Sequence, residues 1–283
     1  MKCIAPQWPV AVRCAGNNMS DIVSEIDKIE KAAQLLRGAE QSATPISPVR
    51  DLFEDTPSPD IGQKIKLCNH QFWKASRQRS GVKTAMTSKV IQEIFALEQS
   101  DYGYLYKDRE LKNGATLSLV KMIAPKLEVE FALRLKNDWA KENSSIDAFV
   151  KNIECVFLAF EIVDSRIEGW NIQGLDAIAD NAASGCYLLD DRVLAVPAEQ
   201  LLELPVSLAR NREELHEGCA KDSLGDPIAH ALELANRCCH HDQPLAAGEI
   251  ILCGAILPLT EINADDAFEA QAGDSKIFLT FTD

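Results

Sequence analysis

Three glutamates stand in two apolar segments of the chain, where unpaired charges are unusual. Glu128 and Glu130 lie in residues 125–133, where polar and apolar residues alternate as in a half-buried strand. Side chains two apart on a strand share a face, so these two carboxylates are expected to point the same way. Glu161 ends the apolar run 156–161, where an unpaired charge would be costly. Adjacent carboxylates repel, and a hard divalent ion such as Mg²⁺ or Mn²⁺ would neutralise them.

The alternative for the Glu128–Glu130 pair is an acidic face exposed to solvent, which is the commoner position of such side chains. Lys83 also has two interpretations. It stands between small and apolar residues in the strand-like segment 81–88. It is either an exposed edge lysine or a partly desolvated ammonium near acidic groups. Asp101, before an aromatic residue and a glycine, is typical of a turn.

Composition restricts the class of protein. The 283 residues suffice for one large domain or two small ones, and the net charge of −14 argues against nucleic acid or an anionic membrane as the main partner. No apolar run has the length of a membrane span. The nine cysteines are scattered without a C-x-x-C pair, which favours a reducing cytoplasm over a secreted disulfide framework. Residues 1–18 lack the apolar core of a signal peptide. Because Met19-Ser20 resembles an alternative start, residues 1–19 are expected to be a disordered extension.

The sequence Cys238-Cys239-His240-His241 offers four potential metal ligands in a row. It follows a helical pattern, and adjacent helical residues diverge around the axis, so they cannot all face one ion. Zinc sites need spaced ligand pairs. We therefore expect the end of a helix here, where a cationic histidine is favourable, and not a metal site.

Helices are expected first and strands later. Ser20 can cap a helix over residues 21–37 that Gly38 can end, and Pro59 suits the first turn of a second helix over 59–79. A third is expected over 89–95 and a fourth over 145–154. The expected strands are 116–122, 127–135, 156–162, 204–209, 250–254, 268–272 and 276–281.

The order of these motifs resembles the 2-keto-4-pentenoate hydratase and 4-oxalocrotonate decarboxylase group of the fumarylacetoacetate hydrolase superfamily. The resemblance covers nearly the whole chain from about residue 20. It rests on residues 48–51, Gly81 and Lys83 with Thr87-Ser88, residues 101–105, Glu128-x-Glu130, residues 161–167, residues 179–182, and Leu224-Gly225 with Pro227.

The resemblance implies an α+β fold. Its core would be a mixed, mainly antiparallel β-roll or barrel like the C-terminal domain of fumarylacetoacetate hydrolase, with a helical N-terminal region. Residues 20–110 would form that helical region, carrying Lys83 and Asp101, and residues 111–283 the β-rich, metal-binding catalytic core of one continuous domain. Members usually assemble as dimers or larger rings, so a homo-oligomer is expected.

The resemblance also implies a site. Mg²⁺ or Mn²⁺ would be held by Glu128, Glu130 and Glu161, and Lys83 and Asp101 would handle protons beside the reacting carbons of a small 2-oxo acid. The positions expected to bind substrate are Thr87, Ser88, Asp180, Asn181, Ser184 and Leu224. The implied activity is hydration of a 2-hydroxy-2,4-dienoate to a 4-hydroxy-2-oxo acid, a lyase reaction of aromatic-compound catabolism.

Three other functions stay open from the sequence. They are decarboxylation of the 4-oxalocrotonate type, carbon–carbon hydrolysis of acylpyruvates, and a catalytically weakened metal-binding relative. The decarboxylase branch tends to lack an acid at the position of Asp101, which favours the hydratase. Lys221 and Asp222 stand where the family usually has small apolar residues, and Ala85 stands where glycine is common. These departures affect the substrate region and leave the three glutamates in place.

Overall fold

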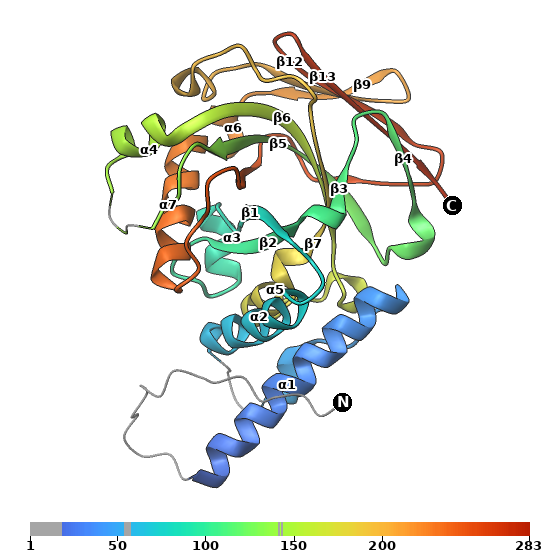
Figure 1. Ribbon diagram of the computed structural model, residues 1–283. Helices are drawn as coiled ribbons and strands as arrows, with labels where there is room; N and C mark the ends of the chain where they lie inside the picture. Colours follow the sequence, from blue (N-terminus) through green and yellow to red (C-terminus); the bar gives the residue numbers. More distant parts are fainter. Residues whose placement is uncertain (1–18, 54–57, 141, 143) are drawn as a thin grey trace.

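The computed structural model describes residues 19–53, 58–140, 142 and 144–283. The extension expected over residues 1–19 lies outside the described residues apart from Met19, which begins the first helix. Within the described part, two mixed β-sheets and several helices form an α+β fold, as expected (Figure 1).

The large sheet carries the candidate site. Its strand order is β2-β1-β10-β5-β6-β7-β3, and β11 also pairs with β5. The strands are β1 Arg79–Ala85, β2 Asp101–Tyr106, β3 Glu110–Leu111, β5 Pro125–Leu135, β6 Ile153–Asp164, β7 Ser184–Leu189, β10 Ile250–Ala255 and β11 Thr260–Glu261. Strand β1 runs parallel to β10, whereas β10, β5, β6 and β7 are successively antiparallel. Strands from before residue 110 therefore belong to the same sheet as the later ones. The expected division into a helical region over residues 20–110 and a β-rich core over residues 111–283 stays a prediction.

The small sheet closes the core from the other side. Its order is β4-β13-β12-β8-β9, formed by β4 Ala115–Ser118, β13 Ser275–Thr282, β12 Ala267–Ala272, β8 Val206–Arg210 and β9 Glu213–Gly218. Along β13, Ile277, Leu279 and Phe281 are buried while Phe278 between them is exposed, the period of two expected of a half-buried strand. The buried face joins Phe131 of the large sheet in one hydrophobic core.

The helices cover the large sheet and one end of the molecule. They are α1 Met19–Ser42, α2 Pro59–Trp73, α3 Lys89–Ile94, α4 Ile146–Asn152, α5 Gly174–Ala179, α6 Ala220–Ser223 and α7 Pro227–His240. Short 3-10 segments are η1 Val49–Leu52, η2 Lys107–Arg109, η3 Leu119–Lys121, η4 Glu168–Trp170, η5 Asn181–Ala183 and η6 Ala198–Gln200. Helices α1, α2 and α5 stack together beneath strands β1, β2 and β7 (Figure 1). Ile29, Ile65 and Leu175 form the second hydrophobic cluster there.

Two helix ends differ from the prediction. Helix α1 continues through Gly38 to Ser42. Gly38 is therefore an interior residue of the helix and not its cap, and nothing lies within 4 Å of the position where it would carry a Cβ. Helix α2 ends at Trp73 rather than near residue 79, with Lys74 as its C-cap, and Arg79 already begins β1. Asp101 is the first residue of a strand and not a turn residue.

Residues 238–241 form the last turn of α7 and its C-cap. Cys238 is fully buried and His240 is exposed, so the two side chains diverge as expected. Among the described residues, only the three glutamates form a group that could hold a metal ion.

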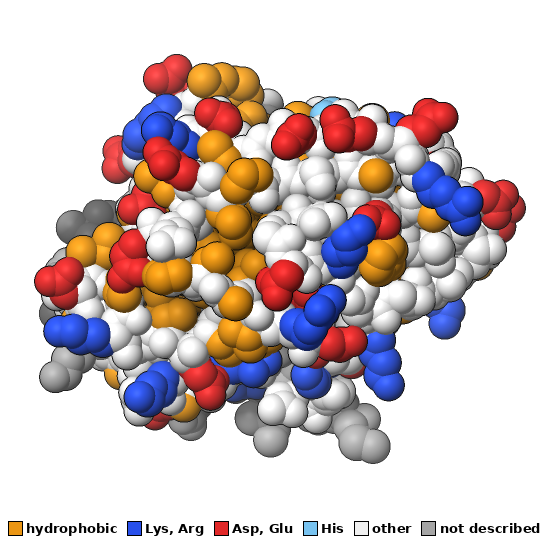
Figure 2. All heavy atoms as spheres, turned by 90° about the horizontal axis from the view of Figure 1, so that it is seen from above, with side chains coloured by type: hydrophobic (Ala, Val, Ile, Leu, Met, Phe, Trp, Pro, Cys, Tyr) orange, Lys and Arg blue, Asp and Glu red, His pale blue; other side chains and the backbone are white. Residues whose placement is uncertain are grey.

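None of the described helices has both the length and the apolar character needed to cross a membrane. On the face seen from above, acidic and basic side chains are interspersed around a hollow where hydrophobic side chains gather (Figure 2).

Candidate metal centre and active site

Strands β5 and β6 bring the three glutamates together. In their antiparallel register, Glu128 stands opposite Glu161 and Glu130 stands opposite Ala159. Directly opposite residues share a face of the sheet, and so do residues two apart on one strand, so all three carboxylates project from one face. One oxygen from each lies within 4.8 Å of the others. The structure therefore gathers these side chains at one point.

Several oxygens of this cluster lack the partners that burial demands. Glu130 and Glu161 are fully buried, and Glu128 is half-buried. The Gly254 N–H donates to Oε2 of Glu130 at 2.7 Å. Oε1 of Glu130 and Oε2 of Glu161 have no hydrogen bond among the described residues, and Oε1 of Glu161 meets only the Lys83 ammonium. Buried carboxylates in this state are costly, and a hard divalent cation with oxygen ligands fits the donor set.

Burial and mutual repulsion disfavour the charged forms of these acids. Burial, followed by the charges of Glu161 and Glu128, raises the pKa of Glu130 well above its usual range. Burial raises the pKa of Glu161 to about 7, although the nearby Lys83 ammonium opposes this shift. Such shifts are the expected result of grouped carboxylates with too little positive charge beside them.

Lys83 supplies a positive charge beside the three glutamates. Its buried side chain projects from β1, and its Nζ lies 2.9 Å from Oε1 of Glu161. The ammonium also donates to the backbone oxygen of Ala182 at 3.1 Å. Burial acts to lower the pKa of Lys83, but the charges of the three glutamates outweigh it and raise that pKa overall. The ammonium is therefore held in its protonated form.

The segment after α5 presents its backbone to Lys83. Asn181, Ala182 and Ala183 all have positive φ angles between 53° and 55°, which non-glycine residues adopt rarely. The Asn181 side chain fixes this conformation, because it accepts from the Tyr104 N–H at 2.7 Å and donates to the Tyr104 oxygen at 2.9 Å. Gly103 permits the approach, since a Cβ there would lie 2.4 Å from the Asn181 oxygen.

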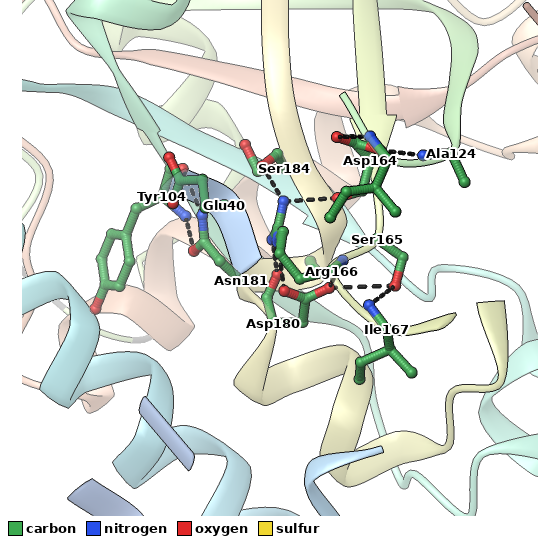
Figure 3. A network of polar contacts seen from close by, with 12 residues as sticks. Glu40, Tyr104, Ala124, Asp164, Ser165, Arg166, Ile167, Asp180, Asn181 and Ser184 are labelled. Atoms are coloured by element: carbon green, nitrogen blue, oxygen red, sulfur yellow. Dashed lines mark hydrogen bonds and ion pairs between the residues drawn. The ribbon is translucent and has the colours of Figure 1, made fainter. Parts of the chain in front are cut away.

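A buried ion pair holds the same segment from the other side (Figure 3). Arg166 Nε donates to Oδ1 of Asp180 at 2.5 Å, and its Nη1 donates to the backbone oxygens of Asp164 and Ser184 at 2.7 and 2.8 Å. Burial raises the pKa of Asp180 to about 6, with Arg166 acting in the opposite direction. Asp180 and Arg166 thus lock the residues that follow α5.

A cavity of about 350 Å³ opens beside the cluster. Of the residues expected to bind substrate, Thr87, Ser88, Asp180 and Leu224 line it, whereas Asn181 and Ser184 do not. Further lining residues that sequence reasoning missed are Thr84, Ile91, Phe95, Ser165, Trp170, Ser223 and Leu259. A signal was available for three of them: Ser165 lies within the motif 161–167, and Thr84 and Ser223 adjoin the motif residues Lys83 and Leu224.

Asp101 lies outside the lining of this cavity. Its buried carboxylate accepts from Lys66 Nζ at 3.0 Å and from Gln63 Nε2 at 2.7 Å, and Nε of Arg237 lies 3.5 Å from Oδ1. It sits on β2, opposite Ala85 of the strand that carries Lys83. The catalytic role expected of Asp101 stays a prediction.

The charged departures from the family pattern point away from the cavity. Lys221 and Asp222 are exposed on α6, and Lys221 Nζ lies 2.8 Å from Glu203. Their neighbours Ser223 and Leu224 line the cavity instead. The unusual charges thus do not alter the lining.

Hydratases from several bacteria share about a third of this sequence. The chain is 32% identical to 2-keto-4-pentenoate hydratase 2 of Dechloromonas aromatica over 86% of this chain and 92% of the relative. It is 33% identical to 2-keto-4-pentenoate hydratase of Paraburkholderia xenovorans over 86% and 90% of the two chains. The chain belongs to the 2-keto-4-pentenoate hydratase family. It is also 31% identical to the 2-hydroxyhexa-2,4-dienoate hydratase of Comamonas testosteroni, over 87% and 94%. No family model matches the chain.

Solved structures share the fold of this hydratase-family chain. The 4-oxalocrotonate decarboxylase from Pseudomonas putida G7, complexed with magnesium and adipate, superposes with a TM-score of 0.84 at 22% identity over 90% of this chain and 98% of that one. The 2-hydroxyhepta-2,4-diene-1,7-dioate isomerase from Mycobacterium marinum gives 0.53 at 11% identity, over 73% and 76%. The family resemblance predicted from the motifs is confirmed.

Proposed function

We propose that this protein is a divalent-metal-dependent hydro-lyase that adds water to a 2-hydroxy-2,4-dienoate and yields a 4-hydroxy-2-oxo acid. Membership of the hydratase family supports the reaction class. The observation that carries the site is the cluster of three carboxylates with unpartnered oxygens beside Lys83 and an open cavity. A small 2-oxo acid is the ligand that suits this combination of charges.

In this proposal Glu128, Glu130 and Glu161 hold the cation, which is Mg²⁺ or Mn²⁺. The fit rests on their grouped oxygens and on the absence of any partner for two of them, Oε1 of Glu130 and Oε2 of Glu161, within the described residues. A divalent ion in this position supplies positive charge that stabilises negative charge developing on the keto oxygen of a 2-oxo acid.

The residues of the chain itself move protons and position the substrate. The Lys83 ammonium has three N–H donors, and Glu161 and Ala182 occupy two directions. The remaining donor is available to a substrate atom, which makes Lys83 the proposed proton carrier. The Thr84 hydroxyl lines the cavity and has no partner among the described residues, so it is a further group that can bind a substrate oxygen.

Asp101 is proposed as the second proton-handling residue, acting on the attacking water. Its place on β2 beside β1 supports proximity to Lys83, because Gly103 of β2 stands opposite Lys83. Its carboxylate is held by Lys66 and Gln63 in the present geometry, so its role needs a test separate from that of Lys83.

The setting follows from the same proposal. The enzyme works in the cytoplasm, in the catabolism of aromatic compounds, as a homo-oligomer of two or more chains. Its β-rich core corresponds to the C-terminal domain of fumarylacetoacetate hydrolase, and the two mixed sheets support this assignment.

The test is hydration of 2-hydroxypenta-2,4-dienoate by the purified protein with Mg²⁺, followed as loss of the dienoate absorbance. Glu130→Ala and Lys83→Ala should each lower turnover by about 10²-fold or more, since each removes charge stabilisation or proton transfer. Glu154→Ala, an exposed position at the start of β6, is the matched control and should retain turnover. Unchanged turnover in both site variants would contradict the assignment of these residues to a hydratase active site. Release of CO₂ from 4-oxalocrotonate in place of hydration would instead support the decarboxylase alternative.

A further inference from the structure

Helix α1 brings one glutamate to the ends of the strands that carry the site. The helix continues past Gly38 to Ser42, and Glu40 stands in this last part. The Glu40 side chain is 23% exposed, and its Oε1 accepts from Nη1 of Arg77 at 2.7 Å and from Nη2 of Arg109 at 2.5 Å. A single carboxylate thus joins the first helix to two arginines that are distant in the sequence.

A third arginine lies near the same carboxylate. Glu40, Arg109 and Arg166 line the same two cavities, one of which has a volume of about 230 Å³, and Figure 3 draws Glu40 and Arg166 in one network. Burial acts to raise the pKa of Glu40, but the charges of Arg166, Arg77 and Arg109 outweigh it and lower that pKa overall. Glu40 is therefore an ionised counter-charge for three guanidinium groups.

Each of these arginines stands at the end of a strand that carries a proposed site residue. Arg77 lies just before β1, Arg109 ends η2 directly after β2, and Arg166 lies just after β6. These three strands bear the two proposed proton-handling residues and one proposed metal ligand. The carboxylate on α1 therefore connects the ends of strands that must keep a fixed arrangement for the site to work.

Arg166 continues this connection into the site. Its guanidinium donates to the Asp180 carboxylate and to the backbone oxygen of Ser184, at the two ends of the segment that follows α5. Within that segment, the Ala182 oxygen accepts from the Lys83 ammonium at 3.1 Å. The carboxylate on α1 does not line the substrate cavity, so its influence on the ammonium passes through this segment.

Loss of the charge on α1 would bear chiefly on Arg166. Arg77 has a second acid, since its Nε lies 3.4 Å from Oδ2 of Asp108, and the Arg109 side chain is 33% exposed and accessible to water. The Arg166 side chain is 7% exposed and has no such access. Like charges that lose a common counter-charge repel, so the contacts of Arg166 with residues 180–184 would be displaced.

We propose that Glu40 is a positioning residue for proton transfer at Lys83. It acts through Arg166 and residues 180–184, and it touches neither the substrate nor the cation. This inference rests on the proposed function, because it assumes that Lys83 carries the proton. It gives helix α1 a part in activity as well as in stability.

Hydration kinetics of Glu40→Gln test this role, because the variant keeps the shape of the side chain and removes its charge. The value of kcat should fall about tenfold, since a small misplacement of a catalytic group lowers the rate strongly. KM and the dissociation constant for Mg²⁺ should stay within about twofold of the wild-type values, because the lost interaction is not one of ligand binding. Glu40→Asp retains the charge and should recover part of kcat.

Glu30→Gln is the matched control. Glu30 stands on the same helix and pairs with Arg37 at 3.2 Å, so this change also removes the charge of an arginine partner on α1. It should leave kcat at the wild-type value. Thermal unfolding of every variant fixes an assay temperature at which all of them are folded, so that a loss of stability does not count as a loss of rate.

Hydrogen exchange of the metal-free protein gives a readout that does not depend on activity. The Ala183 N–H donates to the backbone oxygen of Asp180 at 3.0 Å. In Glu40→Gln, peptides that contain residues 180–184 should exchange about tenfold faster than in the wild type, because the local opening of this segment becomes easier. Peptides from α4, which lies at the other end of the molecule in Figure 1, should exchange at the wild-type rate.

The possible results are distinguishable. Unchanged kcat in Glu40→Gln would overturn the inference, and faster exchange with unchanged kcat would confine Glu40 to the stability of the segment. A parallel loss of kcat and Mg²⁺ affinity would also overturn it, because the change would then act on the three glutamates. Absence of hydration by the wild type would instead contradict the proposed function, and the exchange rates would still decide whether Glu40 holds residues 180–184.

Discussion

Lys83 and Glu161 form a buried ion pair, with 2.9 Å between Nζ and Oε1, and Lys83 also lines the cavity. The side chains are 4% and 0% exposed. They come from β1 and β6, which are separated in the sheet by β10 and β5. The pair therefore connects the proposed proton carrier to the proposed metal site across the width of four strands. A substitution at either residue should change the electrostatic environment of the other.

Lys83→Met tests this connection. Loss of the ammonium leaves the acid cluster with less compensation, and breaking a buried ion pair costs about 3–5 kcal/mol of unfolding free energy. Protonation of Glu161, whose pKa burial already raises, should reduce this cost. Urea unfolding without metal measures it. Lys221→Met, which removes an exposed pair with Glu203, is the control and should unfold like the wild type. Equal stability of the two variants would contradict the account.

The metal-free protein should lose stability as pH rises. Glu130 and Glu161 have pKa values raised in the folded state, so the folded protein binds more protons than the unfolded chain. Their favourable contribution is complete below the ordinary pKa of about 4.5 and is lost as pH rises toward about 7, where Glu161 titrates. A bound cation compensates the ionised carboxylates, so the gain in melting temperature from Mg²⁺ over EDTA should be larger at about pH 8 than at about pH 5.5. A gain independent of pH would count against the site.

Asp101→Asn separates a catalytic role from a structural one. As a proton-handling residue, Asp101 should lose about 10²-fold in kcat on this change, together with one limb of the pH–rate profile. Lys66→Gln removes the main partner of Asp101 outside the cavity and serves as comparison. If both variants lower stability while kcat and the pH profile stay intact, Asp101 only supports the fold of β2.

Arg166→Met should destabilise the loop that presents Ala182 to Lys83. Arg166 and Asp180 are both buried, and loss of one partner leaves an uncompensated charge that costs about 3–5 kcal/mol. Arg166→Lys keeps the charge but loses part of the guanidinium hydrogen bonding to Asp164 and Ser184, so a smaller loss is expected. Thermal unfolding in the presence of EDTA measures both. If Arg166→Met lost no more stability than Arg166→Lys, the result would contradict this role of the ion pair.

Local patterns in the sequence were sufficient for much of the fold. Alternation of apolar and polar residues located β5 and β13, and Pro59 marked the start of α2. Helix ends were harder to predict. A glycine such as Gly38 is compatible with either the end or the continuation of a helix, and tertiary packing decides between them. Strand β2 was missed, since its six residues are all buried and show no alternation.

The site was only partly predictable for a related reason. The shared face of Glu128 and Glu130 follows from strand geometry, but the pairing of Glu128 with Glu161 depends on the β5–β6 register, which no local pattern encodes. The resemblance to a family supplied that step. Asp101 meets Lys66 through the packing of α2 on β2, and this long-range contact left no signal in the sequence.

The most direct measurement is a crystal structure of the protein with Mn²⁺ and oxalate, in which anomalous scattering locates the ion. The account predicts one strong peak at about 2.0–2.4 Å from an oxygen of each of Glu128, Glu130 and Glu161, with oxalate on its cavity side. A peak elsewhere, or no peak with Glu128 turned to solvent, would contradict the central claim that these three carboxylates hold the catalytic cation.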